Sequence, residues 1–162
     1  MKALVIMAHP EPESFSAAMK NVAVRVLKSL GYDVVVSDLY SENFNPVAGR
    51  HDFSTVANSS YFNYQQEQAK ASQERGFSPE ITREQERVKD ADLFVFVYPL
   101  WWGGMPAIMK GWFDRVMANG FAYVDGRRFD SGFFKGKHAL IALTTGGTVE
   151  RFSDDGVYGP IE

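Results

Sequence analysis

The sequence of 162 residues contains no cysteine. Disulfide bonds, thiolate catalysis, iron–sulfur clusters and cysteine-based zinc sites are therefore excluded, and the absence fits a reducing compartment. The net charge is only −3 at pH 7, so the chain has no overall basic character with which to bind nucleic acid. With 45% hydrophobic and 23% charged residues, a chain of this length is expected to form one domain with a full core.

Long apolar runs and targeting patterns are missing as well. The longest apolar stretch, 93–109, is interrupted by two prolines and two glycines, whereas a bilayer span needs about 20 mostly apolar residues. The first apolar run, Ala3–Ala8, is too short for the core of a signal peptide. We therefore predict a soluble, cytoplasmic protein that does not insert into membranes.

Several catalytic motifs are absent. The sequence has no G-x-G-x-x-G, no G-x-x-x-x-G-K-[ST], no G-x-S-x-G and no H-E-x-x-H, so it lacks the standard dinucleotide, P-loop, hydrolase-elbow and zinc-protease signatures. The three histidines, His9, His51 and His138, are scattered along the chain. No metal site is predicted.

Apolar runs that predict strands alternate with patterns that predict helices. The strands are expected at Ala3–Ala8, Val34–Val36, Leu93–Tyr98 and Ala139–Leu143. The helices are expected from a cap at Ser14 or Ser16 to Leu30, from a capping box at Thr82 to about Lys89, and from Pro106 to Val116. This alternation predicts an α/β fold, a doubly wound parallel sheet covered on both faces.

The polar segment Glu42–Pro79 does not fit the alternation. It is rich in asparagine and serine and contains a Gln/Glu/Lys/Ala-rich patch, Gln65–Glu74. We expect a long ordered excursion with one exposed helix. Segments of this length usually serve function or an interface.

Three segments follow predicted strands, where open α/β sheets bind their ligands. The first, His9–Ser16, runs into a helix N-terminus, which favours an anion by about 0.3–1 kcal/mol. Ser14 and Ser16 add hydroxyl groups and His9 a ring donor. The alternative is that the serines only cap the helix and that His9 is an ordinary loop residue.

The second segment contains two adjacent tryptophans, Trp101 and Trp102, followed by Gly103 and Gly104. Burial of one indole contributes up to about 4–6 kcal/mol, so one is expected to pack inward and the other to find a ring or a partner. The glycines allow close approach of the backbone to a ligand. A core tryptophan pair over a glycine turn is the alternative.

The third segment, Thr144–Thr148, supplies hydroxyl and N–H groups, although such loops are also common turns. Together the three segments describe an anion held at the first loop and a planar heteroaromatic ring held at the other two. That is the layout of a flavin in a flavodoxin-like sheet.

Longer motifs support this interpretation. They are His9-Pro-x-x-x-Ser14-Phe15-Ser16, Asp38-Leu-Tyr with Asn43-Phe-Asn-Pro46, Ala91-Asp-Leu93, Pro99-Leu-x-Trp102, Pro106-Ala-Ile-x-Lys110-Gly-Trp-Phe113, Phe121-Ala-Tyr123 and Thr144-Thr-Gly-Gly147. Their combination resembles the NAD(P)H:quinone oxidoreductase (DT-diaphorase) family, over nearly the whole chain. Of these motifs, the block 99–113 followed by 121–123 is specific to this family.

The resemblance implies a single flavodoxin-like domain over residues 1–162, with the excursion at 42–79. It also implies bound FAD (FMN being the alternative), a homodimer, and hydride transfer from NAD(P)H through the flavin to a quinone. Related flavodoxin-like proteins serve as ancillary regulatory subunits of potassium efflux systems, which gives a non-catalytic alternative. A one-electron flavodoxin carrier is a third.

The site residues carried over from the family fall into three groups. Those implied for the cofactor are His9, Ser14, Phe15, Ser16, Asn63, Pro99, Leu100, Trp101, Trp102, Gly103, Thr144, Thr145, Gly146, Gly147 and Phe152. Those implied for the substrate pocket, as part of the pocket of the other subunit, are Ala122, Tyr123 and Val124. The implied catalytic residue is Tyr158.

The sequence departs from the family at three points. The tyrosine and histidine thought to relay charge fall here on Phe152, which has no donor, and on Tyr158, which has a phenol. Trp101 stands where the family usually has glutamine. The family also continues with another strand and helix, which the resemblance implies are lacking in this chain.

Overall fold

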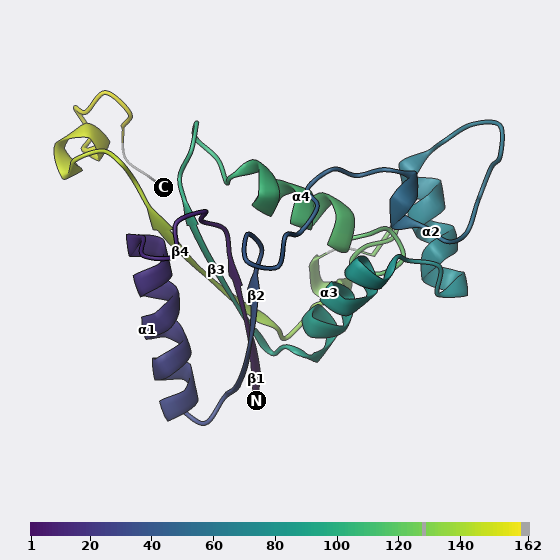
Figure 1. Ribbon diagram of the computed structural model, residues 1–162, viewed down its shortest axis with the longest axis horizontal. Coiled ribbons are helices and arrows are strands. Elements are labelled where there is room, and N and C mark those ends of the chain that lie inside the picture. Colours follow the sequence, from purple (N-terminus) through teal and green to yellow (C-terminus); the bar gives the residue numbers. More distant parts are fainter. Residues whose placement is uncertain (128, 160–162) are drawn as a thin grey trace.

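A computed structural model describes residues 1–127 and 129–159. Four strands form one sheet in the order β2-β1-β3-β4, and every neighbouring pair is parallel. Their bounds are β1 (Lys2–Met7), β2 (Asp33–Asp38), β3 (Leu93–Pro99) and β4 (His138–Thr144). The predicted parallel sheet is confirmed, and the carboxyl ends of all four strands lie at one edge (Figure 1).

Helices lie on both faces of the sheet (Figure 1) and cover the central strands β1 and β3, whereas the edge strand β4 is largely exposed. On one face lies α1 (Phe15–Ser29), whose Leu27 packs with Val5 and Val97. On the other face lie α3 (Pro79–Asp90) and α4 (Ala107–Val116), which bury Ile81 and Trp112 against the opposite side chains of β1 and β3. Successive residues of the two central strands thus enter different cores, which is why both strands are apolar throughout.

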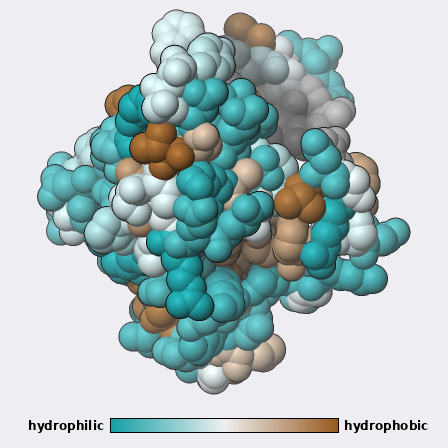
Figure 2. Space-filling model, turned by 90° about the vertical axis from the view of Figure 1, so that its right-hand side faces the viewer, coloured by the Kyte–Doolittle hydropathy of each residue, from teal (hydrophilic) through white to brown (hydrophobic). Residues whose placement is uncertain are grey.

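The predicted excursion is ordered and lies beside α4 at one end of the molecule. It contains a short 3₁₀ helix, η1 (Arg50–Asp52), and α2 (Tyr64–Glu74). A Cβ on Gly111 of α4 would lie 2.2 Å from the carbonyl oxygen of Pro46, so only glycine permits this close approach. The face of the molecule at this end is mostly hydrophilic, with small scattered apolar groups (Figure 2). Within the described residues, no helix is long and apolar enough to cross a membrane.

Two local predictions were wrong. The third helix begins at Pro79 rather than at Thr82, because Ser78 and Pro79 together provide a cap and a preset φ. The helix of the excursion is not simply exposed, since it buries Glu67, Gln68 and Ala71. The inner face of α2 carries polar residues, so the spacing of hydrophobic residues in the sequence does not reveal that this face is buried.

Buried charges connect the excursion to the core. The Arg115 side chain of α4 is fully buried, and its Nε donates to Asp52 Oδ1 at 2.9 Å. Its Nη1 donates to Glu80 Oε2 of α3 at 2.6 Å and to the carbonyl oxygen of Asn45. Burial alone would lower the pKa of Arg115, but the bonds to Asp52 and Glu80 outweigh it and raise the pKa. The guanidinium therefore stays charged and joins three segments.

A second buried carboxylate, Glu84 of α3, joins a strand and two helices. Glu84 Oε2 accepts from Ser37 Oγ of β2 at 2.8 Å and from Trp112 Nε1 of α4 at 2.9 Å. Its other oxygen accepts from Arg87 Nη1 at 2.7 Å. The charge is thus fully paired, as a buried carboxylate requires.

Lys137, just before β4, ties this strand to the end of α3. Its Nζ donates to the carbonyl oxygens of Lys89, at 2.9 Å, and Ala91. Because hydrogen bonds from charged groups contribute about 1.5–3 kcal/mol, we expect Lys137→Met to lower the free energy of unfolding by about 2 kcal/mol. Chemical denaturation measures this loss.

The matched control is Lys135→Met, in which the same charge is removed from an exposed neighbour. No hydrogen bond or ion pair of the Lys135 side chain occurs within residues 1–127 and 129–159. Equal losses in the two variants would contradict the capping role of Lys137.

Candidate functional site

The three segments that follow β1, β3 and β4 converge at one edge of the sheet. Leu100 N donates to the carbonyl oxygen of Thr144 at 2.7 Å, which joins the second loop to the third. The hydroxyl groups of Ser16 and Thr144 lie 3.2 Å apart, which joins the first loop to the third. The rings of His9 and Trp101 lie 6.4 Å apart, which brings the first loop to the second.

The first loop leads directly into α1. Ser14 Oγ caps the helix by accepting from Ala17 N at 3.1 Å. The carboxylate of Glu11 folds back and accepts from Glu13 N at 2.9 Å. Within the described chain, the N–H groups of Phe15 and Ser16 donate to no acceptor. These two groups and the helix dipole provide a binding position for an anion.

The second loop is a tight turn in which both tryptophans remain exposed. Trp101 and Gly104 exchange two backbone hydrogen bonds of 2.9 and 3.0 Å, and Trp102 and Gly103 take positive φ angles of 51° and 72°. Trp101 is 44% exposed and Trp102 is fully exposed. The prediction that one indole packs inward was wrong, because the turn begins immediately after β3 and carries both beyond the core. The buried tryptophan is Trp112.

The third loop presents free backbone donors. In the part of the chain that the structure describes, the N–H groups of Gly146 and Gly147 donate to no acceptor. A Cβ on Gly146 would meet nothing within 4 Å, so its backbone borders open space. A Cβ on Gly147 would lie 2.8 Å from the Phe152 ring, so this glycine allows the aromatic residue to pack against the loop.

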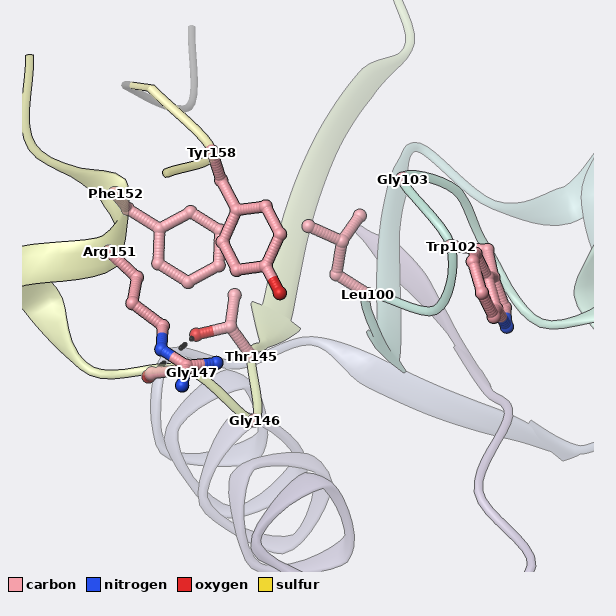
Figure 3. A pocket seen from close by; sticks show the side chains of 9 residues that line it. All are labelled: Leu100, Trp102, Gly103, Thr145, Gly146, Gly147, Arg151, Phe152 and Tyr158. Carbon is pink, nitrogen blue, oxygen red and sulfur yellow. Dashed lines mark hydrogen bonds between the residues drawn. The ribbon is translucent and has the colours of Figure 1, made fainter. Parts of the chain in front are cut away.

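A cavity of about 690 Å³ lies between the second and third loops. Its lining residues are Leu100, Trp102, Gly103, Thr145, Gly146, Gly147, Arg151, Phe152 and Tyr158. Figure 3 shows Leu100 and Trp102 on one side and the aromatic pair Phe152 and Tyr158 on the other, with the glycine loop below. The two aromatic rings of that pair lie 5.3 Å apart and 31° from parallel, and the Tyr158 hydroxyl points into the cavity.

The cavity has the chemistry of a site for a planar heteroaromatic ring. Apart from Arg151, its side walls are aromatic and apolar, whereas its floor offers backbone N–H groups and the Thr145 hydroxyl. Its volume lies within the range of about 300–1,000 Å³ that is usual for small-molecule sites. These features fit the isoalloxazine ring of a flavin, and the anion position at the start of α1 fits its phosphate chain.

Some of the predicted site residues lie outside this cavity. Asn63 caps α2, its Oδ1 accepting from Gln66 N at 3.1 Å. Tyr123 Oη accepts from Gln65 Nε2 of the same helix at 3.2 Å. Neither these residues nor Ala122 and Val124 line the cavity, so their roles toward nucleotide and substrate stay predictions.

Arg151 is the lining residue that sequence reasoning missed. It lies in the 3₁₀ helix η3 (Val149–Phe152), directly after the glycine loop. A single basic residue in a polar segment produces no periodic or motif signal. Its distance of a few residues from the Thr-Thr-Gly-Gly loop is the feature that could have identified it.

Residues 1–162 match the family described as having a flavodoxin-like fold. The chain is 47% identical over 159 residues to a mouse (Mus musculus) ribosyldihydronicotinamide dehydrogenase [quinone], covering 98% of this chain and 69% of that protein. It is 45% identical to rat (Rattus norvegicus) NAD(P)H dehydrogenase [quinone] 1, covering 98% of this chain and 58% of that protein.

The solved structures include a similar protein as well. A candidate quinone reductase from Klebsiella pneumoniae has a TM-score of 0.88 and 39% identity, covering 99% of this chain and 65% of that one. The chain thus spans 58% to 69% of the lengths of these three relatives.

Proposed function

Since the chain belongs to the NAD(P)H:quinone oxidoreductase family of flavodoxin-like proteins, we propose that it is a flavin-dependent enzyme that reduces quinones by two electrons. The overall reaction converts NAD(P)H, a proton and a quinone into NAD(P)⁺ and a hydroquinone. The observation that carries the proposal is one cavity lined both by the fully exposed indole of Trp102 and by the free N–H groups of Gly146 and Gly147. An exposed indole and unused donors that line the same cavity are what a site for a flat polar-edged ring requires.

A bound flavin supplies the two-electron chemistry that connects the hydride donor with the quinone. The N–H groups of Phe15 and Ser16, with the hydroxyl of Ser14 at the helix start, would bind its phosphate chain. Leu100 and Trp102 would hold the face of its ring. The N–H groups of Gly146 and Gly147 on the cavity floor would donate hydrogen bonds to its polar edge and so stabilise negative charge there.

Tyr158 is the proposed proton-handling residue. Its phenol is the side chain in the aromatic wall with a dissociable proton, because its stacking partner Phe152 has none. Figure 3 shows that the Tyr158 hydroxyl is directed into the cavity. It is therefore placed to hold or return a proton at its Oη while a quinone is reduced.

We propose FAD as the flavin, with FMN as the alternative. The ordered excursion supports FAD, because a longer nucleotide needs additional protein wall beyond the ring site. NADH and NADPH are both proposed as donors, and a quinone is proposed as the acceptor.

We propose that the protein forms a homodimer. We also propose that it is located in the cytoplasm. Two observations support the homodimer: the indole of Trp102 lacks cover within its own chain, and the predicted substrate residues at Tyr123 lie beside α2, away from the cavity. In a dimer, residues 122–124 of one subunit are available to complete the site of its partner. Two of the relatives named above are named as quinone dehydrogenases and the third as a candidate quinone reductase, which favours the enzyme over a regulatory subunit.

The test combines pigment identification with a quinone-dependent assay. Purified protein should be yellow, and heat should release a flavin that chromatography identifies as FAD. It should oxidise NAD(P)H when 2-methyl-1,4-naphthoquinone is added and not in its absence. Colourless protein that stays inert after loading with FAD or FMN would contradict the proposed function.

A further inference from the structure

One positive charge lies in the cavity wall. Of the described residues that line the cavity, Arg151 alone is charged. Its stem packs against the glycine loop, since a Cβ on Gly147 would lie 3.4 Å from Arg151 Cδ. Figure 3 shows its guanidinium beside Thr145 and Gly147, below the aromatic pair.

The guanidinium of Arg151 has no counterion within residues 1–127 and 129–159. The adjacent Glu150 forms no ion pair with Arg151, and the Thr148 side chain lowers the pKa of Glu150. A guanidinium has five N–H donors in a planar fork that matches a carboxylate or sulfonate. In Arg151 these donors remain available to a ligand.

The backbone that carries Arg151 is fixed, although its side chain is free. The carbonyl oxygen of Arg151 accepts from Tyr158 N at 3.0 Å. A Cβ on Gly156 would lie 2.5 Å from the same oxygen, so only glycine permits the turn that brings Tyr158 back over Phe152. The aromatic wall and the cation are therefore held together as one unit.

An apolar slot with a cation at one end is suited to an amphiphilic planar ligand. We propose that Arg151 selects electron acceptors whose aromatic ring carries a carboxylate or sulfonate group. The inference rests on the proposed function, because the acceptor is taken to be the quinone that the enzyme reduces. The acceptor ring would lie against the aromatic pair Phe152 and Tyr158, in the part of the cavity that the flavin leaves open, while its anionic substituent pairs with the exposed guanidinium of Arg151 through charge-assisted bonds.

Steady-state kinetics with a charged and a neutral acceptor test the selection. The acceptors are 1,4-naphthoquinone-2-sulfonate and 2-methyl-1,4-naphthoquinone. We expect Arg151→Met to lower the ratio of their kcat/KM values (charged over neutral) about tenfold, the size of one charge-assisted hydrogen bond. Arg151→Lys keeps the charge without the fork, so it should retain part of the ratio. Added salt should reduce the wild-type ratio toward that of Arg151→Met.

The matched control is Arg25→Met, which removes the same charge from α1, outside the cavity. This variant should leave the ratio at the wild-type value. An equal fall in both variants would mean that the overall field of the protein, rather than Arg151, attracts the anion. A loss of NADPH use with an unchanged acceptor ratio would place the anion on the nicotinamide donor, and it would also overturn the proposal.

A redox-inert ligand separates this inference from the proposed function. Calorimetry of the purified holoprotein with naphthalene-2-sulfonate should show binding that Arg151→Met weakens about tenfold. If quinone reduction is absent but this difference is found, the anion site stands and the proposed reaction fails. If quinones are reduced but neither binding nor the kinetic ratio depends on Arg151, the reaction stands and the selection by Arg151 is wrong.

Discussion

Trp102→Ala is expected to weaken flavin binding by ten- to a hundredfold while leaving the stability of the fold nearly unchanged. Stacking of a heteroaromatic ring on an aromatic side chain contributes about 1–3 kcal/mol. Because the Trp102 indole is fully exposed in the chain alone, its removal should change the free energy of unfolding of the flavin-free protein by less than about 0.5 kcal/mol. Quenching of flavin fluorescence and chemical denaturation measure the two effects separately.

Two further variants sharpen this prediction. Trp102→Phe keeps an aromatic face and should recover most of the affinity. Phe129→Ala is the matched control, because Phe129 is also exposed and has a positive φ of 49°, yet does not line the cavity. If Phe129→Ala weakens flavin binding as much as Trp102→Ala does, the assignment of the ring site to the second loop is wrong.

Arg115→Met should cause the largest loss of stability, about 3–5 kcal/mol. The Arg115 guanidinium is buried with Asp52 and Glu80, and its removal leaves two carboxylates without their counterion in a low-dielectric region. The excursion would lose its main polar attachment to α4. We expect the melting temperature to fall by roughly 10 °C, measured by circular dichroism.

Arg83→Met provides the matched control for this loss. Arg83 pairs with Glu42 at 3.4 Å and with Glu84 at 3.6 Å, but its own side chain is 46% exposed, and Glu84 keeps its bonds to Ser37, Trp112 and Arg87 when Arg83 is removed. Exposed pairs of this kind contribute about 0–1 kcal/mol, so the variant should unfold close to the wild-type temperature. A loss of less than about 1 kcal/mol in Arg115→Met would show that the buried network does not hold the excursion.

The central strands β1 and β3 could be predicted from the sequence because their apolar runs have one physical cause, whereas the apolar run of β4 is largely exposed. Residues of β1 and β3 are buried on both faces, so continuous runs such as Leu93–Tyr98 admit few other structures. The start of α3 was misplaced because Thr82 and Gln85 form a plausible capping box. In the fold, Gln85 donates instead to the carbonyl oxygen of Val116 at 3.2 Å.

The part of the candidate site that depends on the order and direction of the strands could be predicted. Parallel strands bring their carboxyl ends to one edge, so the convergence of His9, Trp101 and Thr144 could be inferred from order alone. The exposure of both indoles could not, because it depends on the positive φ of Trp102 and on the exact start of the turn.

Ion pairs between residues that are distant in the sequence could not be predicted. Asp52 and Arg115 are separated by 63 residues, and neither lies in a periodic pattern that marks it as buried. The role of Arg151 could not be predicted for the same reason, because it depends on the cavity that this residue lines. Contacts of this kind are visible only once the excursion and the terminal segment have been placed.

The most direct test is a crystal structure of the protein with its flavin. We expect the isoalloxazine ring to lie in the cavity between the second and third loops, with its polar edge about 3 Å from the N–H groups of Gly146 and Gly147. Trp102 should then contact a ring face or a partner subunit. A ring bound elsewhere, with the cavity empty and Trp102 still in solvent, would contradict it.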